Sequence, residues 1–339
     1  MTRQHRKPVG PVGLILAVAL AGPIMLAPGC RKPSASIPPV HARLGLALQP
    51  TSALAMIAAD NGYFREQNLD LEIKPYISGR RAMAALLCGD VDAVTTAEVP
   101  IVFSSFESSE FRIVASIASA AGQHSIVARR DAGIAQAGDL KGKRIGTQRA
   151  SAVHFFLHLF LLQHQIDADE VTIEFMKGEL LPEALATGRI DAFSMREPYT
   201  SEACNLLGDN ALVFPDEGLY TRTENLVVSS RMLADHRPAV DGLLRALLEA
   251  ERFLAAKPDQ ALAITAKRIS VDAATMSRTW KLLDPHVFLD QSLLGSLEQE
   301  ANWAVESGFT TTKSVPDYLD LIAMEPLTQL RSDLVSIIR

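Results

Sequence analysis

Hydrophobic residues along this chain fall into short apolar runs, and one arrangement of such runs occurs twice. Residues 85–100 read A-L-L-C-G-D-V-D-A-V-T-T-A-E-V-P, and residues 184–198 read A-L-A-T-G-R-I-D-A-F-S-M-R-E-P. In each copy, a helical pattern stops at a glycine, a short apolar strand follows, and a polar turn opens the next helix. The corresponding positions are Gly89 and Gly188, Asp92 and Asp191, and Glu98 and Glu197.

This repeat predicts half of a parallel α/β unit in each part of the chain. In an open parallel sheet, the turn after the carboxyl end of a strand faces the crevice where ligands bind. Two such turns indicate two similar lobes that face one cleft, with residues 95–98 opposite residues 195–199. Each copy alone could be an ordinary helix-to-strand turn, but the shared spacing to a glutamate favours a repeat.

The remaining apolar runs predict an α/β fold with two lobes and a helical carboxyl-terminal block. The chain is expected to cross between the lobes near residues 119–124 and 220–226. Lobe I is then discontinuous, with residues 41–122 and 225–339, and lobe II takes residues 123–224. Strands are predicted over residues 43–48, 71–76, 91–94, 111–118, 125–128, 171–176, 190–194, 212–214 and 226–229, with one more ending near Thr147. Helices are predicted over residues 53–67, 81–87, 99–105, 152–164, 179–187, 237–257, 259–268, 273–283, 291–307 and 317–322.

Residues 1–29 have the pattern of an export signal. A charged head precedes an apolar run over residues 12–27 that is short for a membrane span. The A-P-G-C sequence ending at Cys30 resembles the bacterial lipoprotein box, which implies cleavage and acylation at Cys30. A plain signal peptide with an incidental cysteine is the alternative. Residues 30–40 would form a tether, and the lipid anchor would hold the folded part at a membrane, in the periplasm or at the cell surface.

Charge and cysteine content narrow the possible functions. The chain has 33 Lys and Arg against 39 Asp and Glu, and no basic block follows the tether, so nucleic acid is not expected as a partner. Besides Cys30 only Cys88 and Cys204 are present; neither has the spacing of a zinc ligand, and both are predicted to be buried. The sequence contains no HExxH, nucleophile elbow or phosphate loop. We therefore predict no catalytic residue, metal ion or cofactor.

Three segments carry a family resemblance. The run N-G-Y-F-R-E-Q-N-L-D-L-E-I begins at Asn61, D-L-K-G-K-R-I-G covers residues 139–146, and the pattern D-A-x-x-x-x-E-P covers residues 191–198. Together they resemble the substrate-binding proteins of ABC importers of the sulfonate, nitrate, taurine and thiamine-precursor type. The resemblance implies a type II periplasmic-binding-protein fold in which a monomer captures a small molecule between two lobes. It also implies an ABC permease of the inner membrane as partner.

Candidate ligand-binding residues are those placed at the predicted strand ends and helix starts. Helix N-termini offer free N–H groups and a positive dipole end, which favour an anionic ligand. Hydroxyl and amide side chains would add neutral donors. The predicted set is Thr51, Ser52, Ser78, Gly79, Thr95, Thr96, Glu98, Gln148, Ser151, His154, Arg196, Glu197, Tyr199 and Tyr220.

Two members of this set have clear alternatives. Arg196 could hold a carboxylate or sulfonate with two hydrogen bonds, or it could form an ion pair with Glu197 or with a surface acid. His154 could reach a ligand from the first turn of its helix, or it could be a structural residue. Ser151 is a candidate N-cap for the same helix.

Two other functions remain open from the sequence. The same architecture could serve an enzyme acting on a small metabolite, because a fold alone does not decide function. It could also serve a sensory binding protein that presents its occupied form to a receptor. No residue in the sequence selects the ligand.

Overall fold

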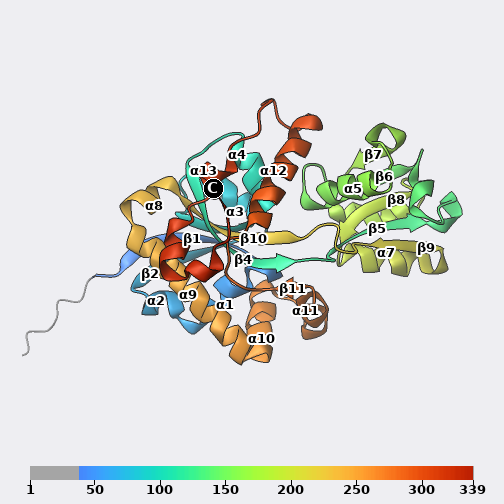
Figure 1. The fold of residues 1–339 in the computed structure, drawn as a ribbon. Helices are drawn as coiled ribbons and strands as arrows, with labels where there is room; N and C mark the ends of the chain where they lie inside the picture. Colours follow the sequence, from blue (N-terminus) through green and yellow to red (C-terminus); the bar gives the residue numbers. More distant parts are fainter. Residues whose placement is uncertain (1–37, 339) are drawn as a thin grey trace, which may run out of the picture. The chain divides into compact units, whose positions relative to one another are not determined.

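The computed structural model describes residues 38–338. The predicted export signal, Cys30 and the tether up to residue 37 lie outside the described residues. The described strands form two sheets, and the two copies of the repeat lie in different sheets (Figure 1).

The first sheet contains β1 (Val40–Ala47), β2 (Leu69–Tyr76), β3 (Ala93–Ala97), β4 (Phe111–Ala120), β10 (Arg222–Ser229) and β11 (Leu283–Asp284). Its order is β11-β4-β10-β3-β1-β2. β1 is parallel to β2 and β3, whereas β10 is antiparallel to β3 and β4. The first repeat therefore ends at the carboxyl end of β3, beside a strand that runs the opposite way.

The second sheet contains β5 (His124–Arg129), β6 (Arg144–Thr147), β7 (Thr172–Phe175), β8 (Ala192–Arg196) and β9 (Ala211–Pro215). Its order is β7-β6-β8-β5-β9. β6 is parallel to β7 and β8, and β5 is antiparallel to β8 and β9. Apart from β11, the two sheets share one topology. Counted from β2 and from β7, the orders are β2-β1-β3-β10-β4 and β7-β6-β8-β5-β9. In each sheet the fourth strand, β10 or β5, directly follows a connection from the other sheet.

The two connections between the sheets are short. Residues 121–123 join β4 to β5, and residues 216–221 join β9 to β10. The prediction that the return strand begins at Leu226 is wrong, since β10 begins at Arg222 and pairs with β4 from that residue onward. The four residues before Leu226 are polar, so their apolar periodicity is weak although they are buried.

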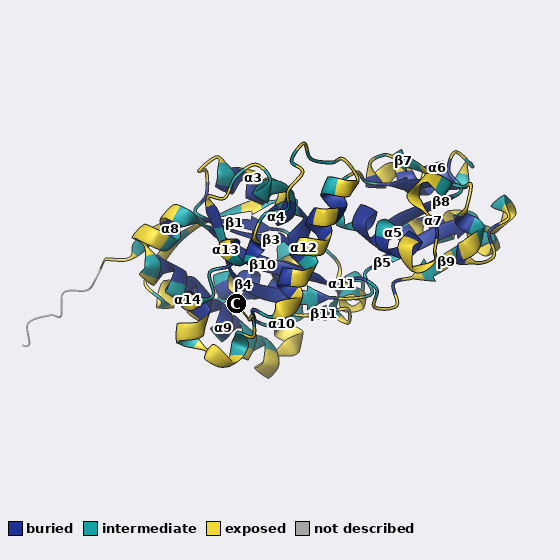
Figure 2. Ribbon diagram, turned by 45° about the horizontal axis from the view of Figure 1, so that its top comes forward, coloured by how far each residue is buried: buried dark blue, intermediate teal, exposed yellow. Residues whose placement is uncertain are grey.

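Helices cover both sheets (Figure 2). The single helix predicted over residues 53–67 is divided, because Gly62 adopts φ +79° and ends the first helix in a left-handed cap. Around the first sheet lie α1 (Ala53–Asn61), α2 (Tyr63–Glu66), α3 (Gly79–Leu87) and α4 (Glu98–Ser105), preceded by the 3-10 turn Pro50–Ser52. Around the second sheet lie α5 (Ala152–Gln163), α6 (Leu181–Ala186) and α7 (Tyr199–Leu207), with 3-10 turns at Arg130–Ala132, Ala137–Leu140, Ala168–Glu170, Gly178–Leu180 and Gly208–Asn210.

The carboxyl-terminal block is helical, as predicted. It contains α8 (Ser230–Asp235), α9 (Arg237–Ala256), α10 (Pro258–Ile269), α11 (Ala273–Trp280), α12 (Gln291–Glu306), α13 (Tyr318–Leu321) and α14 (Glu325–Leu330), then the 3-10 turn Ser332–Leu334. α9 packs its apolar side on α1 and α2, within the core of the first sheet. α12 packs on α4, but its Trp303 belongs to the core of the second sheet. This helix therefore joins the two cores.

The repeated aspartate has the same structural role in both sheets. Asp92 accepts hydrogen bonds from the backbone N–H, Nε and Nη2 of Arg43 at 2.9, 3.0 and 2.7 Å. Asp191 accepts the equivalent three bonds from Arg144 at 2.9, 3.0 and 2.7 Å. Each aspartate directly precedes its own strand and thus connects the start of that strand to the neighbouring parallel strand.

The two cysteines of the described chain are not disulfide-bonded. Cys88 is exposed and Cys204 is partly exposed, so the prediction that both are buried is wrong. Cys88 lies at the carboxyl cap of α3, where the helix turns away from the core.

No helix among residues 38–338 is both long and apolar enough to cross a membrane.

Candidate ligand-binding site

The predicted hydroxyl residues of the first sheet converge on the buried carboxylate of Glu224 in β10. Thr51 Oγ1 donates to Glu224 Oε2 at 2.7 Å, and Ser52 Oγ donates to Glu224 Oε1 at 3.1 Å. Ser52 Oγ also lies 2.9 Å from Thr95 Oγ1, which accepts from the backbone N–H of Ala47. The three hydroxyls therefore lie together, but protein groups already engage them.

Arg222 completes this network from the same face of β10. Its Nη2 donates to Glu224 Oε2 at 2.8 Å, to Gln49 Oε1 at 2.7 Å and to Thr51 Oγ1 at 3.1 Å. The Nε of Arg222 is buried and has no hydrogen-bond partner among the described residues. Sequence reasoning missed Arg222 and Glu224 because the strand was predicted to begin at Leu226. The available signal was two opposite charges at alternate positions, which places both on one face of a strand.

Ser78, Gly79 and Thr96 form a packed corner beside this network. Ser78 is the N-cap of α3, and its Oγ accepts from the backbone N–H of Arg81 at 3.4 Å. A Cβ on Gly79 would lie 3.0 Å from Thr96 Cα, so the helix approaches β3 as closely as a glycine allows. The backbone carbonyl of Thr96 accepts from Asn225 Nδ2 at 3.4 Å. These residues hold the N-terminus of α3 at the end of the sheet.

The predicted loop of the second sheet lies close to the first. Arg80, in the first turn of α3, donates to the backbone carbonyl of Ala150. Ser151 precedes α5 as predicted, but it is not a side-chain cap, because its Oγ donates to the carbonyl of Gln148 at 2.6 Å. Gln148 itself is half-buried. The loop between β6 and α5 is thus folded on itself and touches the start of α3.

His154 packs among aromatic side chains, as the structural alternative predicts. Its ring packs against those of Phe175, Trp303 and Phe309, with centroids 5.0, 5.1 and 5.2 Å away. Burial, with smaller effects from the charges of its neighbours, lowers the pKa of His154 to about 4, so the ring is neutral at physiological pH. Its Nδ1 accepts from the backbone N–H of Ala150 at 3.4 Å.

Arg196 is the member of the set whose charge is left uncompensated. It ends β8 and is half-buried, and its guanidinium forms no hydrogen bond or ion pair with any residue of the described chain. Burial, followed by the positive charge of Arg222, lowers the pKa of Arg196 to about 10. The group therefore remains a cation at neutral pH, with a second cation nearby and no carboxylate paired to it.

Glu197 does not pair with Arg196, so that alternative is wrong. The Glu197 carboxylate is exposed and binds Ser201, accepting from its backbone N–H at 3.2 Å and from its Oγ at 2.7 Å. It serves the first turn of α7. Tyr199 starts the same helix and is half-buried.

Glu98 and Tyr220 are buried rather than open to solvent. Glu98 is the first residue of α4, is fully buried, and accepts from the backbone N–H of Thr223. Tyr220 is 4% exposed and donates its hydroxyl to Glu300 Oε1 at 2.8 Å. Glu98 is the last residue of the predicted turn at residues 95–98 and contacts the second residue of β10. Tyr220 lies in the connection from β9 to β10, where it was predicted.

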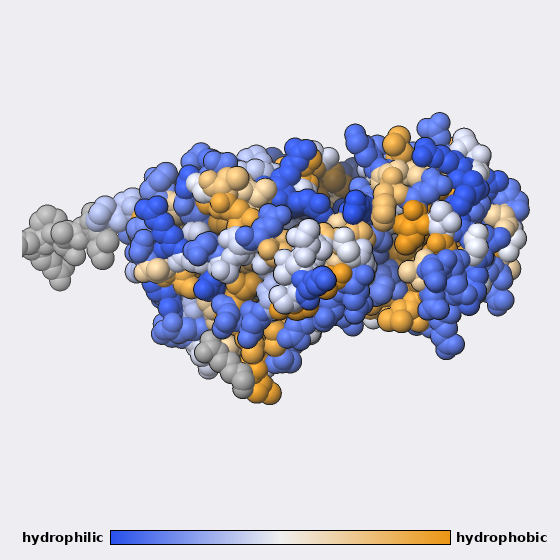
Figure 3. Space-filling view, turned by 90° about the horizontal axis from the view of Figure 1, so that it is seen from above, coloured by the Kyte–Doolittle hydropathy of each residue, from blue (hydrophilic) through white to orange (hydrophobic). Residues whose placement is uncertain are grey.

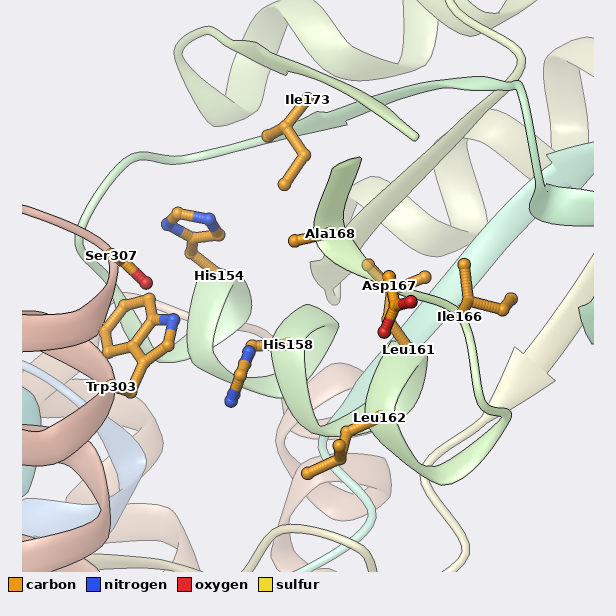
Figure 4. A pocket seen from close by; sticks show the side chains of 10 residues that line it. All are labelled: His154, His158, Leu161, Leu162, Ile166, Asp167, Ala168, Ile173, Trp303 and Ser307. Atoms are coloured by element: carbon orange, nitrogen blue, oxygen red, sulfur yellow. The ribbon is translucent and has the colours of Figure 1, made fainter. Parts of the chain in front are cut away.

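The two most evident cavities lie beside this polar region. One, of about 170 Å³, lies between α5 and α12 and has mostly apolar walls that include His154, His158 and Trp303 (Figure 4). The other, of about 430 Å³, lies beside both connections between the sheets, with Gly122 and Asp216 in its wall. Neither Arg196 nor Arg222 lines either cavity. On the face shown in Figure 3, hydrophilic residues predominate and apolar residues form scattered groups.

The sequence profile named "NMT1/THI5 like" matches residues 49–261, which is more than half of the chain. The chain belongs to the NMT1/THI5-like family. A relative in Brucella abortus, provisionally named a binding protein, is 26% identical over 231 residues, which cover 66% of this chain and 70% of the relative. An Escherichia coli protein provisionally named an aliphatic sulfonates-binding protein is 23% identical, over 59% of this chain and 62% of its own length.

Solved structures confirm the fold predicted for this member of the family. The periplasmic aliphatic sulphonate binding protein SsuA of Escherichia coli matches with a TM-score of 0.69 and 18% identity, covering 81% of this chain and 95% of SsuA. The alkanesulfonate-binding SsuA of Xanthomonas axonopodis, solved with MOPS, matches with a TM-score of 0.68 and 19% identity, covering 85% and 100%. The fold is therefore the two-lobed, type II periplasmic-binding-protein fold.

The fold of this family is also used by an enzyme. The desulfurization enzyme DszB matches with a TM-score of 0.61 and 19% identity, covering 86% of this chain and 99% of DszB. Within residues 38–338, no three His, Cys, Asp or Glu side chains are grouped so that they could hold a metal ion. Function must accordingly be argued from the side chains of the site.

Proposed function

We propose that this protein is the solute-binding component of an ABC importer and that it captures a small organic anion of the sulfonate or carboxylate class. The observation that carries the proposal is the uncompensated guanidinium of Arg196 at the carboxyl end of β8. A half-buried cation without a counter-ion is costly unless a ligand supplies the negative charge.

The surroundings of Arg196 support an anionic ligand. Arg222 lies near enough for its charge to lower the pKa of Arg196, so a second cation is close to this guanidinium. A guanidinium can bind a sulfonate or carboxylate through two parallel hydrogen bonds, which gives orientation as well as affinity. The names of the sulfonate-binding relative and of both SsuA structures agree with this ligand class.

We also propose how the molecule closes on its ligand. The two sheets would form the cores of two lobes, joined at residues 121–123 and 216–221, and the lobes would rotate about these connections. The turn at residues 95–98 would face that at residues 195–199. The occupied, closed form, a monomer, would then be recognised by a permease in the inner membrane.

The location follows from the leader. Cys30 would be acylated after removal of residues 1–29, and residues 30–40 would tether the protein to a membrane on the periplasmic or outer side. Labelling with a fatty acid in a bacterial host tests this: wild type should carry the label and Cys30→Ser should not. Equal labelling of the two proteins would exclude the anchor.

The anion site is tested by calorimetry after a thermal-shift screen of sulfonates, carboxylates and nitrate. Arg196→Ala should weaken binding of the selected anion by about 1.5 to 3 kcal/mol, or roughly 10- to 100-fold, because a charged hydrogen-bonded pair is lost. Arg189→Ala is the matched control, since Arg189 is exposed in the same lobe and pairs with Glu174 at 3.6 Å. Equal affinities of wild type and Arg196→Ala would remove Arg196 from the site.

The similarity to DszB makes an enzyme of the same fold the second candidate. The same screen distinguishes the two, because a binding protein returns its ligand unchanged. Mass spectrometry of the ligand after prolonged incubation should show a single species, and conversion with turnover would favour the enzyme. A sensory role would appear as binding to a receptor domain in place of a permease.

A further inference from the structure

Two glutamates of different helices meet at the segment that leads into β10, and each is only half satisfied. Glu98 of α4 and Glu300 of α12 are both fully buried. Glu98 Oε1 accepts from the Thr223 N–H, and Glu300 Oε1 accepts from the Tyr220 hydroxyl at 2.8 Å. The Oε2 atom of each is buried and has no hydrogen-bond partner among the described residues. A buried, ionised carboxylate with an unpartnered oxygen is unfavourable, so this arrangement points to a bound proton.

The positive charge nearby does not compensate both carboxylates. Arg222 is the cation that acts on Glu98 and on Glu300, but its Nη2 is already bound to Glu224. Glu224 is fully satisfied by Arg222, Thr51 and Ser52. Other charged or titratable side chains on the elements packed around the pair are Arg80 and Arg81 on α3, Tyr220 before β10, His124 on β5, Asp216 after β9, Glu298 and Glu306 on α12, and Tyr318 and Asp320 on α13.

The electrostatics agree with this geometry. Burial raises the pKa of Glu98 to about 7, against which the hydrogen bonds from Thr223 and the charge of Arg222 act only partly. Burial and the charge of Glu98 together raise the pKa of Glu300 well above its ordinary value. At neutral pH the pair therefore holds at least one proton and is poised to exchange another.

We propose that Glu98 and Glu300 form a proton-binding site coupled to the anion site, so that the protein takes up its anion together with a proton. This inference rests on the proposed function. His124 pairs with Arg196 across β5 and β8, and its ring lies 5.2 Å from that of Tyr220, whose hydroxyl binds Glu300. The two sites are therefore neighbours, and the charge of Arg222 acts on both. A bound anion raises the proton affinity of the pair, and by reciprocity a bound proton raises the affinity for the anion.

The sign of the pH dependence follows. Below pH of about 7 the pair is protonated and the surroundings of Arg196 are more positive, so affinity for a strong-acid anion should rise as pH falls from 8 to 6. The limit is about tenfold per pH unit for one fully linked proton. Ethanesulfonate is a suitable first probe, because it remains ionised throughout this range; another alkanesulfonate replaces it if the screen prefers a longer chain.

The test is isothermal titration of wild type at several pH values and in buffers of different ionisation enthalpy. Wild type should take up between zero and one proton per anion at neutral pH. Glu98→Gln, which imitates the protonated acid, should take up fewer protons and bind at pH 8 almost as tightly as at pH 6. Glu300→Gln imitates the proton that the pair already holds at neutral pH, so it should keep the pH dependence of wild type. If Glu98→Gln fails to fold, the proton uptake of wild type still decides the proposal. Glu298→Gln is the control on α12, because Glu298 is exposed, and it should behave as wild type.

The outcomes separate this inference from the proposed function. An anion that binds to wild type without proton uptake, or binds to Glu98→Gln with full pH dependence, overturns the coupling and leaves the anion site standing. Absence of binding to any anion of the screen overturns both. A ligand-free measurement adds independent support: between pH of about 5 and 8, the melting temperature of wild type should fall more steeply with rising pH than that of Glu98→Gln, because the proton bound at Glu98 is lost.

Discussion

The two copies of the repeat are alike in their first half and different in their second. Gly89 and Gly188 adopt φ +75° and +74°, and each lets a helix end and turn into the strand that follows. Asp92 and Asp191 accept the same three hydrogen bonds from an arginine two strands earlier in the local order. This half of the motif lies at the amino end of β3 and of β8 and builds the sheet.

The second half diverges where the strands end. The position of Arg196 in β8 corresponds to Ala97 in β3, so one sheet presents a cation and the other a methyl group. Glu98 is fully buried, whereas Glu197 is exposed and serves α7. The comparison teaches that a duplicated α/β unit keeps its helix-to-strand half for stability, while its strand-to-helix half is free to acquire different chemistry.

The largest losses of stability are expected from substitutions in the helix-to-strand half of the motif, which the two copies share. Burial alone would raise the pKa of Asp92, but the hydrogen bonds from Arg43 outweigh it; for Asp191 the bonds from Arg144 dominate, and both pKa values are lowered. Asp92→Ala and Asp191→Ala should each lower the free energy of unfolding by about 2 to 3 kcal/mol, because several charged hydrogen bonds are lost.

Urea denaturation of the two variants measures this equivalence. Asp131→Ala is the matched control, because Asp131 also binds an arginine, Arg129, through two bonds, but is 53% exposed. Its loss should be much smaller than that of either aspartate, because solvent screens this exposed pair. A large difference between the unfolding free energies of Asp92→Ala and Asp191→Ala would show that the two aspartate–arginine contacts are not equivalent.

The next largest effect on stability concerns a helix position at which the two lobes carry different residues. His154 of α5 corresponds to Ala53 of α1, counting from Arg144 and Arg43. With a folded pKa of about 4 and an unfolded value near 6.5, His154 contributes stability that is fully present above pH of about 6.5 and is lost as pH falls toward 4. At pH 5 the loss should be about 2 kcal/mol relative to a side chain that does not titrate.

His154→Phe tests this, since an aromatic ring can keep the contacts with Phe175, Trp303 and Phe309. The difference in unfolding free energy between wild type and the variant should change by about 2 kcal/mol between pH 8 and pH 5, in favour of the variant at pH 5. A difference that does not vary with pH would mean that His154 can become charged without leaving its aromatic surroundings.

Much of the fold could be predicted from the sequence, because short apolar runs bounded by glycine and capping residues specify local structure. The repeat, the order of strands and helices and the crossing near residue 121 follow from such patterns. The start of β10 does not, since its first residues are Arg222, Thr223 and Glu224, and a polar strand has no apolar period to detect. These residues are buried only because the other elements of the fold surround them.

The site was predictable in part for the same reason. The position of Arg196 at a strand end could be inferred from the repeat, but its lack of a partner is a property of the packed structure. His154 was placed at the start of a helix correctly, yet its aromatic neighbours come from β7 and from the distant α12 region. Contacts between remote segments decide which polar residues are structural, and a single sequence does not contain them.

The smallest effect is expected at two glycines that occupy equivalent places, Gly79 at the start of α3 and Gly178 before α6. A Cβ added to Gly79 would lie 3.0 Å from Thr96 Cα, and backbone cannot move without disturbing β3. A Cβ added to Gly178 would lie 2.7 Å from Met195 Cε, the end of a flexible side chain that can rotate away. Gly79→Ala should therefore lower stability by about 1 to 2 kcal/mol, and Gly178→Ala by less than about 1 kcal/mol. Thermal denaturation of both variants, with Gly138→Ala as a control where a Cβ meets no atom within 4 Å, measures the difference. Equal losses at Gly79 and Gly178 would contradict this expectation. They would show that Met195 is held as firmly as the backbone of β3. The two sheets would then be more alike at this corner than their sequences indicate.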